Sequence, residues 1–118
     1  MKVELDNATN RVLGAIALGE FVERLRGKHV HVTQLLSWRP GTGFERHSTV
    51  RSEFSLYVAQ TMWQMSGGHY VIYGQREFQY SIGTSNLHTI EIETNQLIAT
   101  ELFGTEAERQ STVTILSA

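Results

Sequence analysis

The sequence predicts an α+β fold: a mostly antiparallel β-sheet with two α-helices packed on one face. Two segments, 18–26 and 51–65, carry apolar residues at the three- and four-residue spacing of a helix. Most of the remaining chain alternates apolar with polar residues, as half-buried strands do, between turns rich in glycine and asparagine. At 118 residues, of which 41% are hydrophobic, residues 1–118 form a single domain large enough to bury a core.

The first helix is best defined over 18–26, where an apolar face stands opposite a charged one. Its apolar face consists of Leu18, Phe21, Val22 and Leu25. Gly27 marks its end. The preceding segment, 11–17, fits either a buried strand or a first helical turn. Gly14 and Gly19 disfavour one long helix, because each costs about 1 kcal/mol in a helix interior.

The second helix is expected over 51–65, after a cap at Ser48 or Thr49 and before a stop at Gly67 and Gly68. Five residues share its helical spacing and predict core packing: Phe54, Tyr57, Val58, Met62 and Met65. Glu53 suits its first turn.

Strands are expected wherever apolar residues recur at every second position. In 28–38, Val30 and Val32 would face the core, with His29, His31 and Thr33 on the opposite side. The other strand segments are 3–5, the hairpin pairs 69–74 with 76–82 and 88–93 with 96–103, and a closing strand at 112–117, which follows an acidic connection at 104–110.

Charge and composition narrow the function classes. The net charge is −2, but residues 24–51 carry six cations against Glu45, and residues 77–118 carry six acids against Arg109. The split suggests a basic ligand surface or contact between subunits, and the overall acidity argues against long nucleic-acid partners. Without cysteine there is no disulfide or thiolate chemistry. With no N-terminal apolar run and no span of about 18 apolar residues, we expect a cytoplasmic protein outside the membrane.

The segment 38–51 is the strongest anion-site candidate in the sequence. Gly41 and Gly43 allow a tight turn that exposes backbone N–H groups, beside the only proline, Pro40. The guanidiniums of this segment, which could clamp a phosphate or carboxylate, belong to Arg39, Arg46 and Arg51. The alternative is a surface connector with solvated charges.

A second candidate site lies downstream. Phe78 and Tyr80 could stack on a flat ring, with Thr84 or Asn86 supplying polar contacts. Core packing is the alternative for these aromatic residues. Arg109 could pair with Glu106 or Glu108, or reach an anion across a subunit boundary.

Catalytic and metal sites are weakly indicated. His29 and His31 share a strand face and could bind zinc or copper only with a third ligand, so we expect no metal or cofactor. His31-Val32-Thr33 and His47-Ser48-Thr49 match the His-x-Thr pattern of two-histidine phosphoesterases, in which one imidazole acts as base and the other as acid. No Gly-x-Ser-x-Gly, P-loop or dinucleotide motif is present.

The chain resembles the anti-Thoeris sponges, small phage proteins that sequester bacterial immune signals. The resemblance rests on the cysteine-free chain, the glycine–arginine loop at 39–51 and the run from Arg76-x-Phe78-x-Tyr80 to Asn86-Leu87-His88. It implies a non-enzymatic homo-oligomer in the infected cell that binds cyclic ADP-ribose variants, and in some members cyclic oligonucleotides at a separate site. The candidate ligand residues are Phe78, Tyr80, Asn86, His88 and Arg109 for one site, and Arg39, Gly41, Gly43, Arg46 and Arg51 for a phosphate site.

Three function hypotheses follow, in decreasing order of preference. The first is a ligand-sequestering protein that binds an anionic, cyclic-nucleotide-like molecule. The second is a small phosphoesterase using His31 and His47. The third is an inhibitor or antitoxin that binds a partner protein.

Overall fold

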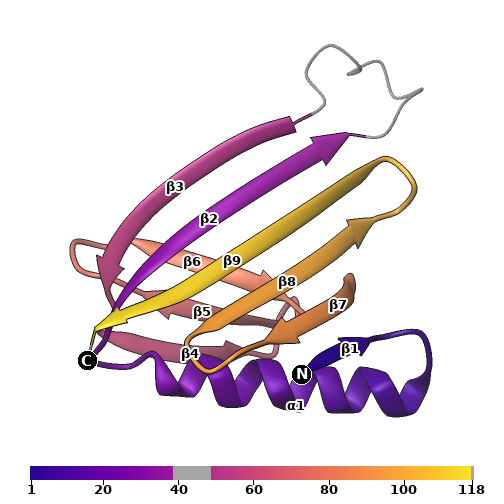
Figure 1. The fold of residues 1–118 in the computed structure, drawn as a ribbon, viewed down its shortest axis with the longest axis horizontal. Helices are drawn as coiled ribbons and strands as arrows, with labels where there is room; N and C mark the ends of the chain where they lie inside the picture. Colours follow the sequence, from indigo (N-terminus) through magenta and orange to yellow (C-terminus); the bar gives the residue numbers. More distant parts are fainter. Residues whose placement is uncertain (39–48, 118) are drawn as a thin grey trace.

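The computed structural model describes residues 1–38 and 49–117, which form mostly antiparallel sheet beside one α-helix (Figure 1). The elements are β1 (Lys2–Glu4), α1 (Ala8–Arg24), β2 (His29–Trp38), β3 (Thr49–Tyr57), β4 (Gln60–Gln64), β5 (His69–Tyr73), β6 (Gln79–Gly83), β7 (Leu87–Ile92), β8 (Gln96–Phe103) and β9 (Ala107–Ser117). Six strands form a large sheet in the order β1-β7-β8-β9-β2-β3, and three form a small sheet in the order β4-β5-β6.

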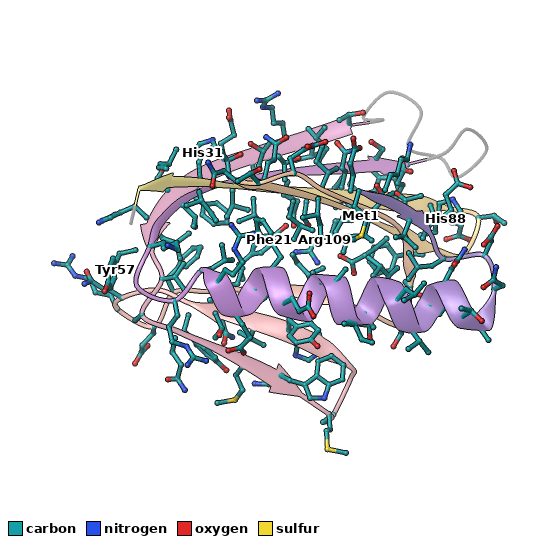
Figure 2. All side chains as sticks on the ribbon, turned by 60° about the horizontal axis from the view of Figure 1, so that its bottom comes forward. Met1, Phe21, His31, Tyr57, His88 and Arg109 are labelled. Atoms are coloured by element: carbon teal, nitrogen blue, oxygen red, sulfur yellow. The ribbon has the colours of Figure 1, made fainter. Side chains whose placement is uncertain are left out.

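The molecule has two layers, with the large sheet on one side and α1 together with the small sheet on the other (Figure 2). The core lies between the layers and draws on all three units, for example Phe21 from α1, Ile72 from β5 and Val32 from β2. The other face of the large sheet carries no covering element in the described part of the chain (Figure 2). This outer face is therefore open to solvent or to a partner.

Strand β2 shows the expected alternation. Val30 and Val32 are fully buried, and His31 and Thr33 belong to the outer face. β2 is hydrogen-bonded on both sides, to β3 and to β9, over nearly its whole length. It is the middle strand of β9, β2 and β3, the three strands at the end of the large sheet where the candidate site lies.

One helix, α1, contains the whole segment 11–17, which resolves that ambiguity in favour of helix. Asn7 caps it by accepting a hydrogen bond from the Asn10 N–H at 2.8 Å. Its two interior glycines lie where neighbours come close: a Cβ at Gly19 would lie 2.5 Å from the Tyr70 hydroxyl oxygen. Close packing of α1 against the small sheet thus explains why Gly19 stands in the helix, although glycine destabilises an isolated helix.

The expected second helix is wrong, and with it the fold prediction of two helices. Segment 51–65 forms β3 and β4, and β3 pairs with β2 from Thr49 opposite Ser37 to Tyr57 opposite His29. Of the residues assigned to a helical core face, Tyr57, Met62 and Met65 are exposed. The three- and four-residue spacing was coincidental, and pairing with β2 decided the conformation.

The boundary residues proposed for that helix have other roles. Thr49 begins β3, so it caps no helix, and Ser48 lies outside the described residues. Gly67 and Gly68 have φ of 88° and 60° and form the turn between β4 and β5.

The downstream hairpins are confirmed: β5 pairs with β6, and β7 pairs with β8. The expected acidic connection at 104–110 is shorter than predicted, because β9 already begins at Ala107. Among the described helical residues, no helix has the length and apolar character needed to cross a membrane.

Candidate ligand-binding groove

An open groove of about 540 Å³ lies where the end of β3 meets the loop that joins β5 to β6. Figure 2 places Tyr57, one of its lining residues, at one end of the molecule. The residues lining it are His29, Phe54, Ser55, Leu56, Tyr57, Gln75, Phe78 and Leu116. The volume falls within the range of small-molecule sites in proteins.

Four rings border the groove. The Phe54 and Phe78 rings meet edge to face with centroids 4.8 Å apart, and the His29 and Tyr57 rings are 5.2 Å apart. Phe78 and Tyr57 retain 37% and 39% of their surface exposed, and Leu116 retains 58%. Exposed apolar side chains gathered in a hollow are typical of a binding site for an apolar or aromatic group.

The loop that carries Phe78 has an unusual backbone. Arg76 and Glu77 have φ of 57° and 65°, a left-handed conformation that side-chain-bearing residues seldom adopt. The Gly74 N–H donates to the Phe78 carbonyl at 2.8 Å, and a Cβ at Gly74 would lie 3.0 Å from a methyl carbon of Leu56. A tight turn held in a conformation that costs about 1–3 kcal/mol per residue therefore sets Phe78 at the groove.

The polar groups of the groove suit an anionic or neutral ligand. They are the His29 imidazole, the Ser55 and Tyr57 hydroxyls and the Gln75 amide, and none of the described lining residues is acidic. Arg76 stands in the same turn as Gln75 and Phe78. A ring could thus lie against aromatic walls while a charged group meets imidazole, amide or hydroxyl donors.

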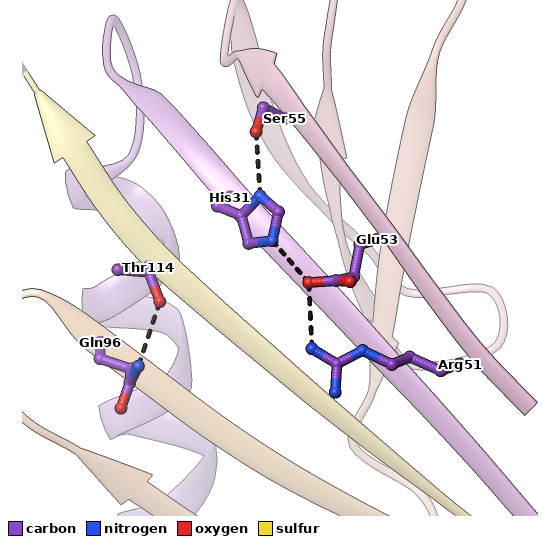
Figure 3. A network of polar contacts seen from close by, with 6 residues as sticks. All are labelled: His31, Arg51, Glu53, Ser55, Gln96 and Thr114. Atoms are coloured by element: carbon purple, nitrogen blue, oxygen red, sulfur yellow. Dashed lines mark hydrogen bonds and ion pairs between the residues drawn. The ribbon is translucent and has the colours of Figure 1, made fainter. Parts of the chain in front are cut away.

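A polar network on the outer face adjoins the groove through Ser55 (Figure 3). His31 Nδ1 lies 2.9 Å from Ser55 Oγ, and His31 Nε2 lies 3.2 Å from Glu53 Oε1. Arg51 Nη2 donates to the same Glu53 oxygen at 3.1 Å. Hydrogen bonds from Arg51 and then His31 lower the pKa of the Glu53 carboxyl to about 2. Glu53 is therefore charged at neutral pH.

Arg109 lies between the layers (Figure 2) and its donors are used within the fold. Nε donates to Gln34 Oε1 at 2.9 Å, Nη1 to Glu101 Oε1 at 3.3 Å and Nη2 to the Ser81 carbonyl at 2.8 Å. The guanidinium also covers the Tyr80 ring at 4.7 Å. Arg109 therefore pairs with Glu101, and not with Glu106 or Glu108, and it links the large sheet to the small one.

The predicted aromatic site divides. Phe78 lines the groove, whereas Tyr80 is a core residue, 7% exposed, whose hydroxyl bonds Ser111 Oγ at 2.6 Å. Asn86 is exposed, and its carbonyl accepts the Leu102 N–H. His88 is exposed on β7, at the opposite end of the molecule from Tyr57 in Figure 2. The structure thus brings neither Asn86 nor His88 to the groove.

The predicted phosphate site falls largely on residues that the structure does not describe: Arg39, Gly41, Gly43 and Arg46. Arg51 is described, and it lies exposed on the outer face with Glu53. The chain leaves β2 after Trp38, nine residues from His29, which corresponds to about 30 Å along a strand. Within one chain, the groove and that end of β2 are therefore well separated.

Sequence reasoning missed most of the groove. Phe54 and Tyr57 were assigned to a helical core, and Gln75 and Leu116 were not singled out. A strand interpretation of 49–57 would have placed Phe54 and Leu56 on one face, but it would not have shown which loop packs beside them. His29 and His31 do share the outer face, and no cluster of three potential metal ligands occurs among residues 1–38 and 49–117.

The fold and groove together define a small two-layer α+β protein with an aromatic-walled groove. No protein-family model matches the chain, and no curated protein matches its sequence. Among solved structures, the fold is similar to that of the Bacillus subtilis YojF protein, with a TM-score of 0.62 and 10% sequence identity. The match covers 88% of this chain and 92% of YojF. At this identity the similarity concerns the fold alone.

Proposed function

We propose that this protein is a non-catalytic, cytoplasmic binding protein that sequesters a nucleotide-like ligand. The observation that carries the proposal is the groove, which the Phe54, Phe78 and Tyr57 rings line together with hydrogen-bond donors. A base could stack on these rings, and its phosphate could meet the His29 imidazole or the Gln75 amide. The sequence resemblance makes cyclic ADP-ribose variants and cyclic oligonucleotides the first ligands to test.

The exposed rings support binding more than simple core packing. A core aromatic residue is normally buried, as Tyr80 is, whereas Phe78 keeps over a third of its surface exposed. The strained turn at Arg76 and Glu77 holds it there. Backbone strain of this kind is concentrated at binding and catalytic sites.

The decisive experiment measures binding to matched variants. Native mass spectrometry and calorimetry with adenine-containing cyclic nucleotides and ADP-ribose isomers would identify the ligand and its affinity. We expect Phe78→Ala to weaken binding about 10- to 100-fold, because stacking on one aromatic side chain contributes about 1–3 kcal/mol per base. Phe103→Ala is the matched control, since Phe103 is similarly exposed, at 39%, at the end of β8 away from the groove.

Two results would contradict the proposal. One is the absence of binding by any ligand of the panel at millimolar concentration. The other is an equal loss of affinity in Phe78→Ala and Phe103→Ala, because the groove would then not be the site. Release of intact ligand on denaturation would support sequestration.

A hydrolytic function is the second candidate, supported by the Ser55–His31–Glu53 contacts. In this arrangement Ser55 could pass its proton to His31 Nδ1, while His31 Nε2–H donates to Glu53. His47, the other imidazole of the two-histidine hypothesis, lies outside the described residues. Recovery of a cleaved ligand, abolished in both Ser55→Ala and His31→Ala, would favour this candidate over sequestration.

A further inference from the structure

Strand β3 forms a long free edge of the large sheet. It is the last strand in the sheet order, and among the described residues its only partner is β2. Figure 1 shows it along the margin of the sheet, with β2 on one side and no strand or helix on the other side of its upper half. The strand at the opposite edge, β1, has three residues, whereas β3 has nine. A long edge strand presents unpaired backbone N–H and C=O groups to other chains.

The side chains of β3 alternate between the two faces. Arg51 and Glu53 lie on the outer face, with 60% and 45% of their side chains exposed. Val50 and Phe54 lie on the inner face, where Val50 is 47% exposed. The edge therefore carries a cation, Arg51, and an anion, Glu53, two residues apart, and a partly exposed apolar residue, Val50.

Two-fold symmetry restricts how two copies of β3 can pair. The two-fold axis stands perpendicular to the sheet, so a residue of one copy faces a residue of the other copy on the same face of the sheet. Because side chains alternate between the faces, the numbers of two facing residues must add to an even number, which is the same for every pair. If the residue numbers add to 102, the two Arg51 side chains face each other directly. If they add to 106, the two Glu53 side chains do so, and both arrangements place like charges at short spacing. The sum of 104, centred on Ser52, sets Arg51 against Glu53 twice.

We propose that β3 is the contact surface for a second copy of this chain, paired antiparallel about Ser52. In this register the two Arg51 and two Glu53 side chains alternate in sign around the axis on the outer face. On the inner face, Val50 of each copy lies opposite Phe54 of the other, which covers the exposed valine. Opposite charges and aromatic–aliphatic pairs are the favourable combinations for directly opposed strand residues.

The pairing also has a consequence for the groove. Thr49 of one copy lies opposite Ser55 of the other, and Ser55 lines the groove. The beginning of β3 in one subunit would thus stand at the margin of the partner's binding groove. The proposal itself rests on the edge and its charges, and it stands whether or not the groove binds a ligand.

Charge reversal tests the register. Sedimentation velocity across a concentration series gives the dimer dissociation constant of the wild type, of Arg51→Glu and of Glu53→Arg. Each single reversal replaces two opposite-charge pairs with two like-charge pairs, so we expect dissociation constants raised about 10- to 100-fold. Glu106→Arg is the matched control, an equal charge change in the exposed turn between β8 and β9, and should leave the constant unchanged.

Mixing the two single variants gives the sharper result. An Arg51→Glu copy carries two acids on its edge and a Glu53→Arg copy carries two cations, so they should form a heterodimer more tightly than either forms a homodimer. The double variant, with both residues exchanged, should recover wild-type affinity. A monomeric wild type would overturn the proposal, as would a dimer that the single reversals leave intact or a mixture that forms no heterodimer.

Discussion

Replacing Arg109 tests whether this residue is a structural cation or a ligand-binding one. The side chain is 17% exposed, and its guanidinium donates hydrogen bonds to the Gln34 amide oxygen, the Glu101 carboxylate and the Ser81 carbonyl. Arg109→Met keeps the length of the aliphatic stem and removes every one of these hydrogen bonds. Glu101, 3% exposed, is then left as a buried carboxylate without its cation.

The expected cost is large for a domain of this size. Removing one partner of a buried ion pair costs about 3–5 kcal/mol, because the remaining charge is desolvated without compensation. Total stabilities of small domains are about 5–15 kcal/mol, so Arg109→Met should come close to unfolding the protein. Adding Glu101→Gln removes the stranded charge while retaining an oxygen for the Gly83 N–H. The double variant should regain about 2 kcal/mol, within the coupling range of contacting residues.

The penalty should also depend on pH. Burial raises the pKa of Glu101, and Arg109 opposes that rise. Without Arg109 the folded-state pKa of Glu101 rises further, so the folded form of the variant holds its proton more tightly than the unfolded form does. Stability of Arg109→Met relative to wild type should therefore fall as the pH rises past the folded-state pKa of Glu101 in the wild type, which already lies above the ordinary value of 4.5.

Urea unfolding followed by circular dichroism, at pH 5 and pH 8, provides these numbers. A cost below about 1 kcal/mol for Arg109→Met, typical of an exposed ion pair, would refute a structural role. So would the lack of any recovery in the double variant. In either case Arg109 would again be a candidate for ligand binding.

Two further outcomes are expected. Gly19→Ala should lower the free energy of unfolding, although alanine normally favours a helix, because the new Cβ would lie 2.5 Å from the Tyr70 hydroxyl oxygen. Adding Tyr70→Phe to this variant should recover part of the lost stability. If Gly19→Ala alone stabilised the protein, the packing of Gly19 against Tyr70 would be contradicted. NMR titration should give Glu53 a pKa near 2, with stability from this group present above pH 4.5 and lost as pH falls toward 2. Arg51→Gln should return that pKa toward its ordinary value, and a value near 4.5 in the wild type would show that the network does not form in solution.

The second helix shows where sequence reasoning failed. Residues 51–65 match a helical spacing at five positions, but their aromatic and β-branched side chains also favour a strand. Short segments of this kind are compatible with both conformations. The partner strand β2 decided between them, and nothing within 51–65 identifies that partner.

The same limit applies to the candidate site. Phe78 was proposed as a ring that could stack on a flat ligand, and it does line the groove. Arg109 was identified as an isolated cation in an acidic region, but its partner Glu101, eight residues away, was missed because the β8–β9 pairing was not known. Residue type thus indicated chemistry, and the pairing of strands determined which groups meet.

What the sequence determined by itself was local: the inward valines of β2, the two downstream hairpins, and the helix around Phe21. These follow from side-chain periodicity and turn residues, which act over a few positions. Only the tertiary structure decided that 49–57 is a strand, that Arg109 is a buried link, and that Phe54, Tyr57 and Phe78 share a groove. The physical reason is that a helix satisfies its backbone hydrogen bonds within one segment, whereas a strand depends on segments elsewhere in the chain.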